Sequence, residues 1–277
     1  MSLRAIAILL SLPYFVIPQW ESWYVPLIFW FGILIIGIPH GAVDHHIQLK
    51  DKTDNKSKLI AFIGKYISLM GLFLLFWILA PIYAIAFFIL ISAYHFGMVD
   101  FGHPRNILSK LLATIYGLAL LGSIILSDKM MVASILEMLQ INNGIINRYL
   151  SSAGYTPYLL ILLVTIIVAV KKAYKLWWTI ALLFIGTEMP LLLTFGLYFS
   201  FQHALESTFE IRNHLNISIL KLVKLSMPFS VGAYFIGILV FLLISSENIT
   251  IESILPFVFL FLGMVTLPHV VYYSFEE

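Results

Sequence analysis

Four of the eight histidines lie inside long apolar segments, and they are the residues best suited to carry chemistry. They are His40, His95, His203 and His269. A neutral imidazole binds zinc, copper or iron, and it is costly in a bilayer core unless it faces other protein groups. Taken singly, each could be a structural residue hydrogen-bonded to a neighbouring helix. A shared metal ion would explain all four together.

The positions of these histidines along their segments predict that they lie at one depth. If ten spans are numbered from a cytoplasmic N-terminus, the four histidines belong to spans 2, 4, 8 and 10, which run in the same direction. Each lies 13 or 16 residues after its span begins, which is roughly 20–24 Å along a helix. We therefore expect a single layer of four imidazoles that binds one metal ion.

The chemistry of the available ligands favours iron(II) over structural zinc. The chain has no cysteine, whereas structural zinc sites generally include thiolate. Four neutral imidazoles around iron(II), with positions open for O₂, fit a redox centre better. Carboxylates that accept imidazole N–H groups usually support such ligands. Asp44, one helical turn after His40, and Glu206, three residues after His203, are the candidates, although Asp44 could also be a solvated or helix-capping carboxylate.

The segments that carry these residues predict an all-α, polytopic transmembrane helix bundle. Of the 277 residues, 61% are hydrophobic and 11% are charged, and apolar runs of about 17–22 residues are long enough to cross a bilayer. We expect eight to ten spans, with ten favoured, in a single domain of residues 1–277, and an interfacial helix or loop at 128–150. The expected spans are 3–18, 24–40, 59–79, 82–98, 107–126, 155–170, 176–187, 190–209, 229–246 and 253–273.

The distribution of basic residues supports ten spans with both termini in the cytoplasm. This arrangement places all but two of the 16 Lys and Arg residues inside, leaving Lys129 and Arg148 outside, in accord with the positive-inside rule. The net charge of +2 is too small to predict a nucleic-acid partner. We expect the lipid bilayer of the cell (inner) membrane as the environment. The first segment lacks a small-residue cleavage site, so we interpret it as a helix rather than a signal peptide.

Two of the histidines lie in distinctive motifs, Ile38-Pro39-His40-Gly41-Ala42-Val43-Asp44 and Tyr94-His95-Phe96-Gly97-Met98-Val99-Asp100-Phe101. The first resembles the PHG(A)xD signature and the second the xHFGxxDF signature of a known family, the Brp/Blh family of membrane β-carotene 15,15'-dioxygenases. Weaker resemblances follow at Tyr198-Phe199-Ser200-Phe201-Gln202-His203 and Thr266-Leu267-Pro268-His269. The likeness keeps its order and spacing over nearly the whole chain.

The resemblance implies an iron(II) enzyme that cleaves the central double bond of β-carotene with O₂ to give two retinals, which a microbial rhodopsin would consume. It implies His40, His95 and His203 as iron ligands. The family pattern H-S-x-x-H would place a fourth imidazole where this chain has Ser207. Three possibilities follow: His269 is the fourth ligand, which the depth argument favours, or Glu206 takes that place, or the site and its activity are altered.

Three other functional classes also use histidines inside a membrane. A transporter or channel with a proton relay would place acids and histidines in its spans, and a haem-binding electron carrier would need histidine pairs on facing spans. A di-iron desaturase or hydroxylase would need several histidine boxes, and only His40-x4-His45-His46 imitates one. We expect His45 and His46 to face water or lipid headgroups, and we expect the loop residues His103 and His214 to be incidental.

Overall fold

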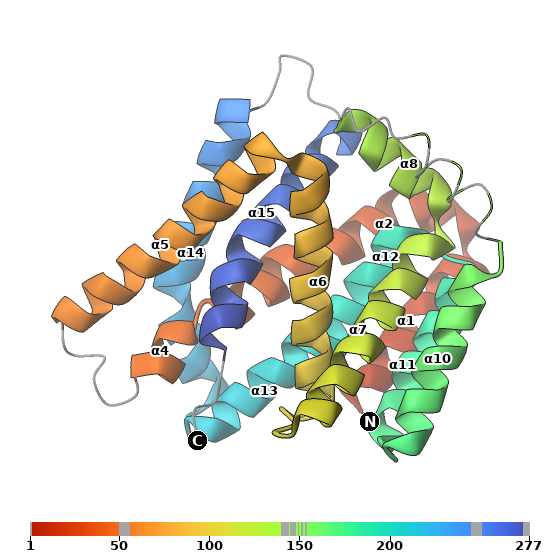
Figure 1. Cartoon of the computed structure of the whole chain (residues 1–277), viewed down its shortest axis with the longest axis horizontal. Helices are drawn as coiled ribbons and strands as arrows, with labels where there is room; N and C mark the ends of the chain where they lie inside the picture. The colour runs from red at the N-terminus through yellow and green to blue at the C-terminus, as the bar shows by residue number, and fades with distance from the viewer. Residues whose placement is uncertain are drawn as a thin grey trace. The chain divides into compact units, whose positions relative to one another are not determined.

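The computed structural model describes residues 2–49, 56–139, 154–244 and 251–273, together with residues 144, 148, 150 and 152. In these ranges the regular structure is helical throughout, which confirms the all-α prediction. The α-helices are α1 (Leu3–Val16), α2 (Glu21–Trp30), α3 (Ile38–Gly41), α4 (Asp44–Leu49), α5 (Lys56–Leu79), α6 (Pro81–Asp100), α7 (Ile107–Ser127), α8 (Lys129–Met138), α10 (Thr156–Val170), α11 (Trp177–Gly186), α12 (Leu191–Leu197), α13 (Leu205–His214), α14 (Ile219–Ile244) and α15 (Ile251–Tyr272) (Figure 1). Two segments are π-helical, η2 (Phe31–Gly37) and η5 (Tyr198–Ala204), and two are short 3₁₀ turns, η1 (Pro18–Trp20) and η4 (Tyr174–Leu176).

Six helical stretches are long and apolar enough to cross a membrane, among the residues that the structure describes. They are Pro18–Leu49, Lys56–Leu79, Pro81–Asp100, Ile107–Ser127, Ile219–Leu243 and Ile254–Tyr272. Three shorter apolar helices accompany them: Leu3–Val16, Thr156–Val170 and Tyr174–Gly186. These lengths and compositions support an integral membrane protein. The ten-span count and the cytoplasmic termini stay predictions.

Two of the candidate spans, α5 and α14, show how apolar the surface is. Only 17% of the most apolar stretch of each helix is buried. Leu75 and Leu79 on α5, and Leu242 and Leu243 on α14, are each more than half exposed. Soluble proteins rarely expose contiguous apolar surface on this scale, whereas lipid chains cover such a surface without cost.

The start of α14 differs from the sequence prediction. The predicted span begins at residue 229, directly after Pro228, but the helix begins at Ile219 and continues through the proline. Proline removes one backbone hydrogen bond, and membrane helices tolerate it because nearby groups satisfy the freed backbone. Lys221 and Lys224 consequently lie on the helix rather than in a loop.

The predicted interfacial segment 128–150 is helical over its first part. Helix α8 begins after Asp128, whose carboxylate accepts hydrogen bonds from the backbone N–H groups of Met131 at 3.0 Å and Leu191 at 3.1 Å. These bonds satisfy N–H groups at the start of α8 and the start of α12. Residues 140–143, 145–147 and 149 lie outside the described residues. The interfacial location of this segment stays a prediction.

The chain divides into two compact units, each built from two separate stretches of sequence. Unit 1 consists of Met1–Gly37 and Ser92–Thr208, and unit 2 of Ile38–Ile91 and Phe209–Glu277. The boundary at residue 37 is where η2 ends and α3 begins, whereas the boundaries after residues 91 and 208 fall within α6 and α13. The prediction of a single domain is not tested by this division.

Close backbone packing holds the part of α6 that belongs to unit 1 against α7. A Cβ atom on Gly97 of α6 would overlap the carbonyl group of Ala113, and a Cβ atom on Gly117 of α7 would overlap that of Ala93. Glycine at such contacts lets two helices approach more closely than side chains permit. Helix α7 also packs along α10, and η2 packs against η5. The two glycines therefore fix the position of the helix that carries His95.

Unit 2 is held by contacts of α15 with α3, α4 and α5. The Gln48 side chain donates to the Tyr272 carbonyl at 2.9 Å, and the Tyr66 and Tyr272 rings stack with centroids 6.2 Å apart. A Cβ atom on Gly263 would overlap the Phe73 ring, so α15 and α5 also pack closely. These contacts position His269 near the C-terminal end of α15.

We expect Gly97→Val to destabilise the protein by about 1–3 kcal/mol, because the added side chain must displace the α7 backbone. Thermal unfolding of the purified protein in detergent measures the effect. Gly71→Ala is the matched control, because Gly71 lies in a helix interior with open space around it, and it should change stability by no more than about 1 kcal/mol. Equal thermal midpoints for the two variants would contradict the packing argument.

Candidate metal centre

Unit 1 brings two of the predicted histidines together. The ring centroids of His95 on α6 and His203 in η5 are 4.9 Å apart, with planes at 77°. One ring nitrogen of each lies within 4.8 Å of the other, and both side chains are buried. Two buried imidazoles this close can bind one metal ion through adjacent coordination positions.

The backbone that carries His203 is π-helical, which the sequence did not predict. Single π-helical turns are less stable than α-helix and occur often at functional sites. Here the turn places His203 against Phe96, with ring centroids 4.3 Å apart, and against Phe199 at 5.9 Å. Gly32 of η2 allows this arrangement, because a Cβ atom there would overlap the Ser200 hydroxyl.

Unit 2 brings the other two predicted histidines together. The ring centroids of His40 on α3 and His269 on α15 are 4.8 Å apart, with planes at 73°. Both side chains are buried. Tyr273 packs beside them, with its ring centroid 5.9 Å from that of His40 and 4.9 Å from that of His269. Each unit thus contains one buried imidazole pair, while the predicted layer of all four stays a prediction.

Asp44 holds one of these imidazoles in place. Nδ1 of His269 lies 2.9 and 3.0 Å from the two carboxylate oxygens of Asp44, and the Tyr66 hydroxyl donates to one of them at 3.4 Å. An ionised carboxylate only accepts hydrogen bonds, so a bond to ionised Asp44 places the proton on Nδ1 and the ring lone pair on Nε2, the tautomer that a metal-binding imidazole uses. Asp44 is 1% exposed, so its interpretation as a solvated carboxylate is wrong. Its role at a metal ion stays a prediction.

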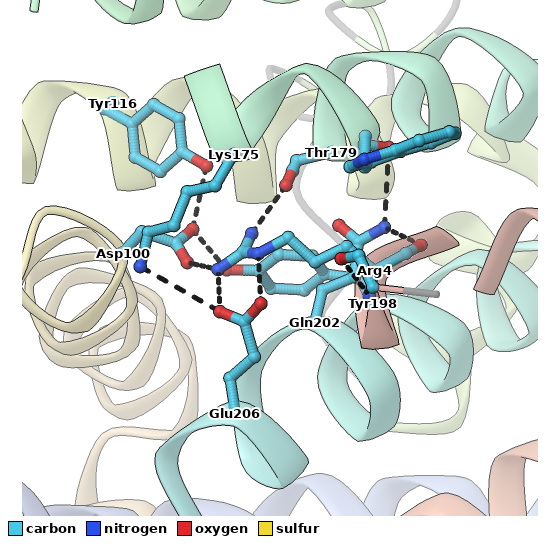
Figure 2. Close-up of polar contacts among 10 residues, drawn as sticks. Arg4, Asp100, Tyr116, Lys175, Thr179, Tyr198, Gln202 and Glu206 are labelled. Atoms are coloured by element: carbon cyan, nitrogen blue, oxygen red, sulfur yellow. Dashed lines mark hydrogen bonds and ion pairs between the residues drawn. The ribbon is translucent and has the colours of Figure 1, made fainter. Parts of the chain in front are cut away.

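Glu206, the second predicted supporting carboxylate, contacts a cation. Nε of Arg4 donates to one of its oxygens at 2.8 Å, and a terminal nitrogen of Arg4 donates to the other at 2.6 Å (Figure 2). Asp100, five residues after His95, is bound to the same guanidinium. Sequence analysis missed Arg4, although a lone basic residue in an apolar segment was the signal that could have found it. Support of an imidazole by Glu206 stays a prediction.

Of the four remaining histidines, His45 differs from its prediction in exposure. His45 is buried, with its ring stacked 4.0 Å from that of Phe229, so the prediction that it faces water or lipid headgroups is wrong; α4 packs against α5 and α15 and carries the ring inward. His46 is half-buried, and His214 is exposed at the end of α13. His103 follows α6 in a left-handed turn at φ 54°.

Comparisons with known proteins identify the family to which this chain is similar. The family model for beta-carotene 15,15'-dioxygenase matches residues 31–275. A protein of that name from uncultured marine bacterium 66A03 is 26% identical over 261 residues, which cover 88% of this chain and 90% of the relative. No solved structure matches. The resemblance first drawn from the motifs around His40 and His95 is confirmed.

We expect Asp44→Asn to weaken metal binding by about 10–100-fold, because a neutral amide no longer fixes the Nδ1 proton and ring orientation of His269. Titration of the metal-free purified protein with Co²⁺ measures the affinity. Glu137→Gln is the matched control, since it neutralises an exposed carboxylate on α8. If Asp44→Asn binds Co²⁺ as tightly as this control, the carboxylate does not support a metal ligand.

Proposed function

The chain belongs to the β-carotene 15,15'-dioxygenase family, and on this premise we propose that it cleaves the central 15,15' double bond of β-carotene with O₂ to give two retinals. Family membership over most of the chain is the observation that carries the proposal. The two buried imidazole pairs support it, because O₂ chemistry in enzymes is generally carried by a redox metal or another cofactor.

We propose that His40, His95, His203 and His269 are the ligands of one Fe²⁺ ion. The His95–His203 and His40–His269 pairs, at 4.9 and 4.8 Å between centroids, provide donors of the type that iron accepts. His40, His95 and His203 also fall in the family motifs. When bound, iron supplies one-electron redox chemistry and positions open for O₂.

His269 is the best candidate for the fourth ligand, where the family pattern has an imidazole and this chain has Ser207. It packs beside His40, and the Asp44 carboxylate at its Nδ1 is the kind of support that metal-binding imidazoles have. Glu206 is less suitable, because both of its oxygens are bound to Arg4. The proposed site therefore keeps four nitrogen donors without the imidazole at position 207.

The protein's own residues would give this site two properties. Four neutral imidazoles bring no negative charge, so the ion keeps its full charge toward a bound substrate. Phe96 and Phe199 beside His203, and Tyr273 beside His269, surround the imidazoles with apolar rings. Such walls exclude water, which protects a reactive site from side reactions.

The membrane setting suits a polyene substrate. β-carotene dissolves in the lipid core, and the exposed apolar surfaces of α5 and α14 place the protein in the same phase. We propose a single domain with ten spans, both termini cytoplasmic, in the cell (inner) membrane. Retinal released into the bilayer would be available to a microbial rhodopsin.

Expression in a β-carotene-producing host should replace the orange colour with retinal, and it should do so only with O₂ present. His40→Ala and His95→Ala should lower retinal formation by about 100-fold or more, because each removes a proposed metal ligand. His214→Ala is the control, since it removes an exposed histidine. Persistent colour with folded, iron-loaded protein would refute the proposed activity.

The fourth ligand can be identified by metal analysis of purified variants. We expect His269→Ala to lose most of its iron and Ser207→Ala to keep it. An optical spectrum without a haem Soret band should accompany iron in the wild-type protein. Retention of iron by His269→Ala together with its loss from Glu206→Gln would assign the fourth position to Glu206 instead.

A further inference from the structure

Arg4 is a fully buried arginine in the first helix of unit 1. Its exposed fraction is 0%, and it is the largest side chain that is wholly buried among the described residues. A buried cation is stable only when its charge and its N–H groups are matched by nearby acceptors. The contacts of Arg4 therefore show which parts of unit 1 it holds together.

The guanidinium binds three different helices. One terminal nitrogen donates to Asp100 of α6 at 2.5 Å and to Glu206 of α13 at 2.6 Å, while Nε donates to the other oxygen of Glu206 at 2.8 Å. The second terminal nitrogen donates to the Thr179 hydroxyl of α11 at 2.7 Å. Figure 2 shows the guanidinium between the two carboxylates.

A second layer of hydrogen bonds connects this cluster to η5. The other oxygen of Asp100 accepts from the Tyr116 hydroxyl at 2.8 Å and from the Tyr198 hydroxyl at 3.2 Å. The Gln202 side chain donates to the backbone carbonyl of Arg4 at 3.2 Å. Tyr198, Gln202 and Glu206 lie at the start of η5, near its end and just beyond it, so they bracket His203 on both sides.

A π-helical turn needs such support. It is less stable than an α-helix, so contacts from neighbouring helices must favour it over the α-helical form. Reversion of η5 to an α-helix would shift its register by one residue, a rotation of about 100°. That rotation would carry the His203 ring away from His95.

We propose that Arg4 is a positioning residue for the His95–His203 pair. Through Asp100 it fixes the end of α6 five residues after His95, and through Glu206 and the Asp100 carboxylate that binds Tyr198 it holds η5 in its π-helical form. Its effect on metal binding rests on the proposed iron site, whereas its effect on the backbone of η5 does not. The family match begins at residue 31, so it includes both carboxylates but not Arg4.

The experiment compares Arg4→Lys and Arg4→Met with Lys175→Met in the purified full chain. Lys175 is a matched control because it is the other cation near Glu206, at 4.0 Å, and its side chain is 48% exposed, so its contribution is small. Amide hydrogen exchange over residues 198–204 reports on η5, and titration of the metal-free protein with Co²⁺ reports on the imidazoles.

In both Arg4 variants we expect amide exchange at 198–204 to be at least about tenfold faster and Co²⁺ affinity to be about tenfold weaker. Exchange in α10, which has no bond to the cluster, should be unchanged, and Lys175→Met should match the wild type. Wild-type exchange at 198–204 in the Arg4 variants would overturn the proposal. If the wild type binds no Co²⁺, the iron site fails, and hydrogen exchange alone decides the role of Arg4.

A charge-neutral variant separates positioning from simple charge compensation. Arg4→Met combined with Asp100→Asn and Glu206→Gln removes the buried charges together, which should recover thermal stability relative to Arg4→Met. Exchange at 198–204 and Co²⁺ affinity should stay altered, because the neutral side chains do not rebuild the three-helix contact. Full recovery of both would show that Arg4 only compensates the buried charges.

If the Arg4 variants do not fold, Thr179→Val decides, since it removes one guanidinium hydrogen bond and no charge. Faster exchange at 198–204 supports the proposal, and unchanged exchange refutes it.

Discussion

The cost of burying polar groups in an apolar bundle governs the arrangement of this protein. A charged or hydrogen-bonding side chain cannot face lipid without a large penalty, so each buried one must find its partner inside the protein. In unit 2 the Asp44 carboxylate meets the imidazole of His269. In unit 1 the Arg4 guanidinium meets Asp100 and Glu206. Both carboxylates of unit 1 lie within one or two helical turns of a proposed metal ligand, so the same pairing that makes burial tolerable also fixes the imidazoles.

Departures from regular α-helix accompany three of the four histidines. The π-helical segment η2 ends at Gly37, shortly before His40, and η5 contains His203. Pro268 directly precedes His269 and removes a hydrogen bond from α15. Irregular backbone in a membrane protein is tolerated where protein rather than lipid surrounds it. The histidines thus occupy the places where the helices are least regular and the surrounding contacts matter most.

Much of the fold could be predicted because apolar runs bounded by Pro, Gly and charge report directly on membrane helices. The start of α14 could not, because Pro228 lies within a helix rather than at its end. That Asp44 would meet an imidazole followed from its type and place, but its partner is 225 residues away, and a single sequence carries no signal of that pairing. The π-helical segment η2 has the apolar composition of an ordinary span, and the polar residues of η5 do not by themselves distinguish a π-helix from an α-helix. His45 is buried because α4 packs against α5 and α15. The lysines that follow it in the sequence instead suggested an exposed position.

The ion cluster around Arg4 has a consequence for the order of events during synthesis. Arg4 leaves the ribosome before its carboxylate partners, and Glu206 follows it 202 positions later. At roughly 5–20 residues per second this delay is about 10–40 s. Asp100 of α6 follows after about half of that time, and until then the cation in α1 has no carboxylate to neutralise it, so water or lipid headgroups must solvate it. Helix α1 is therefore made well before the residues that neutralise its buried charge.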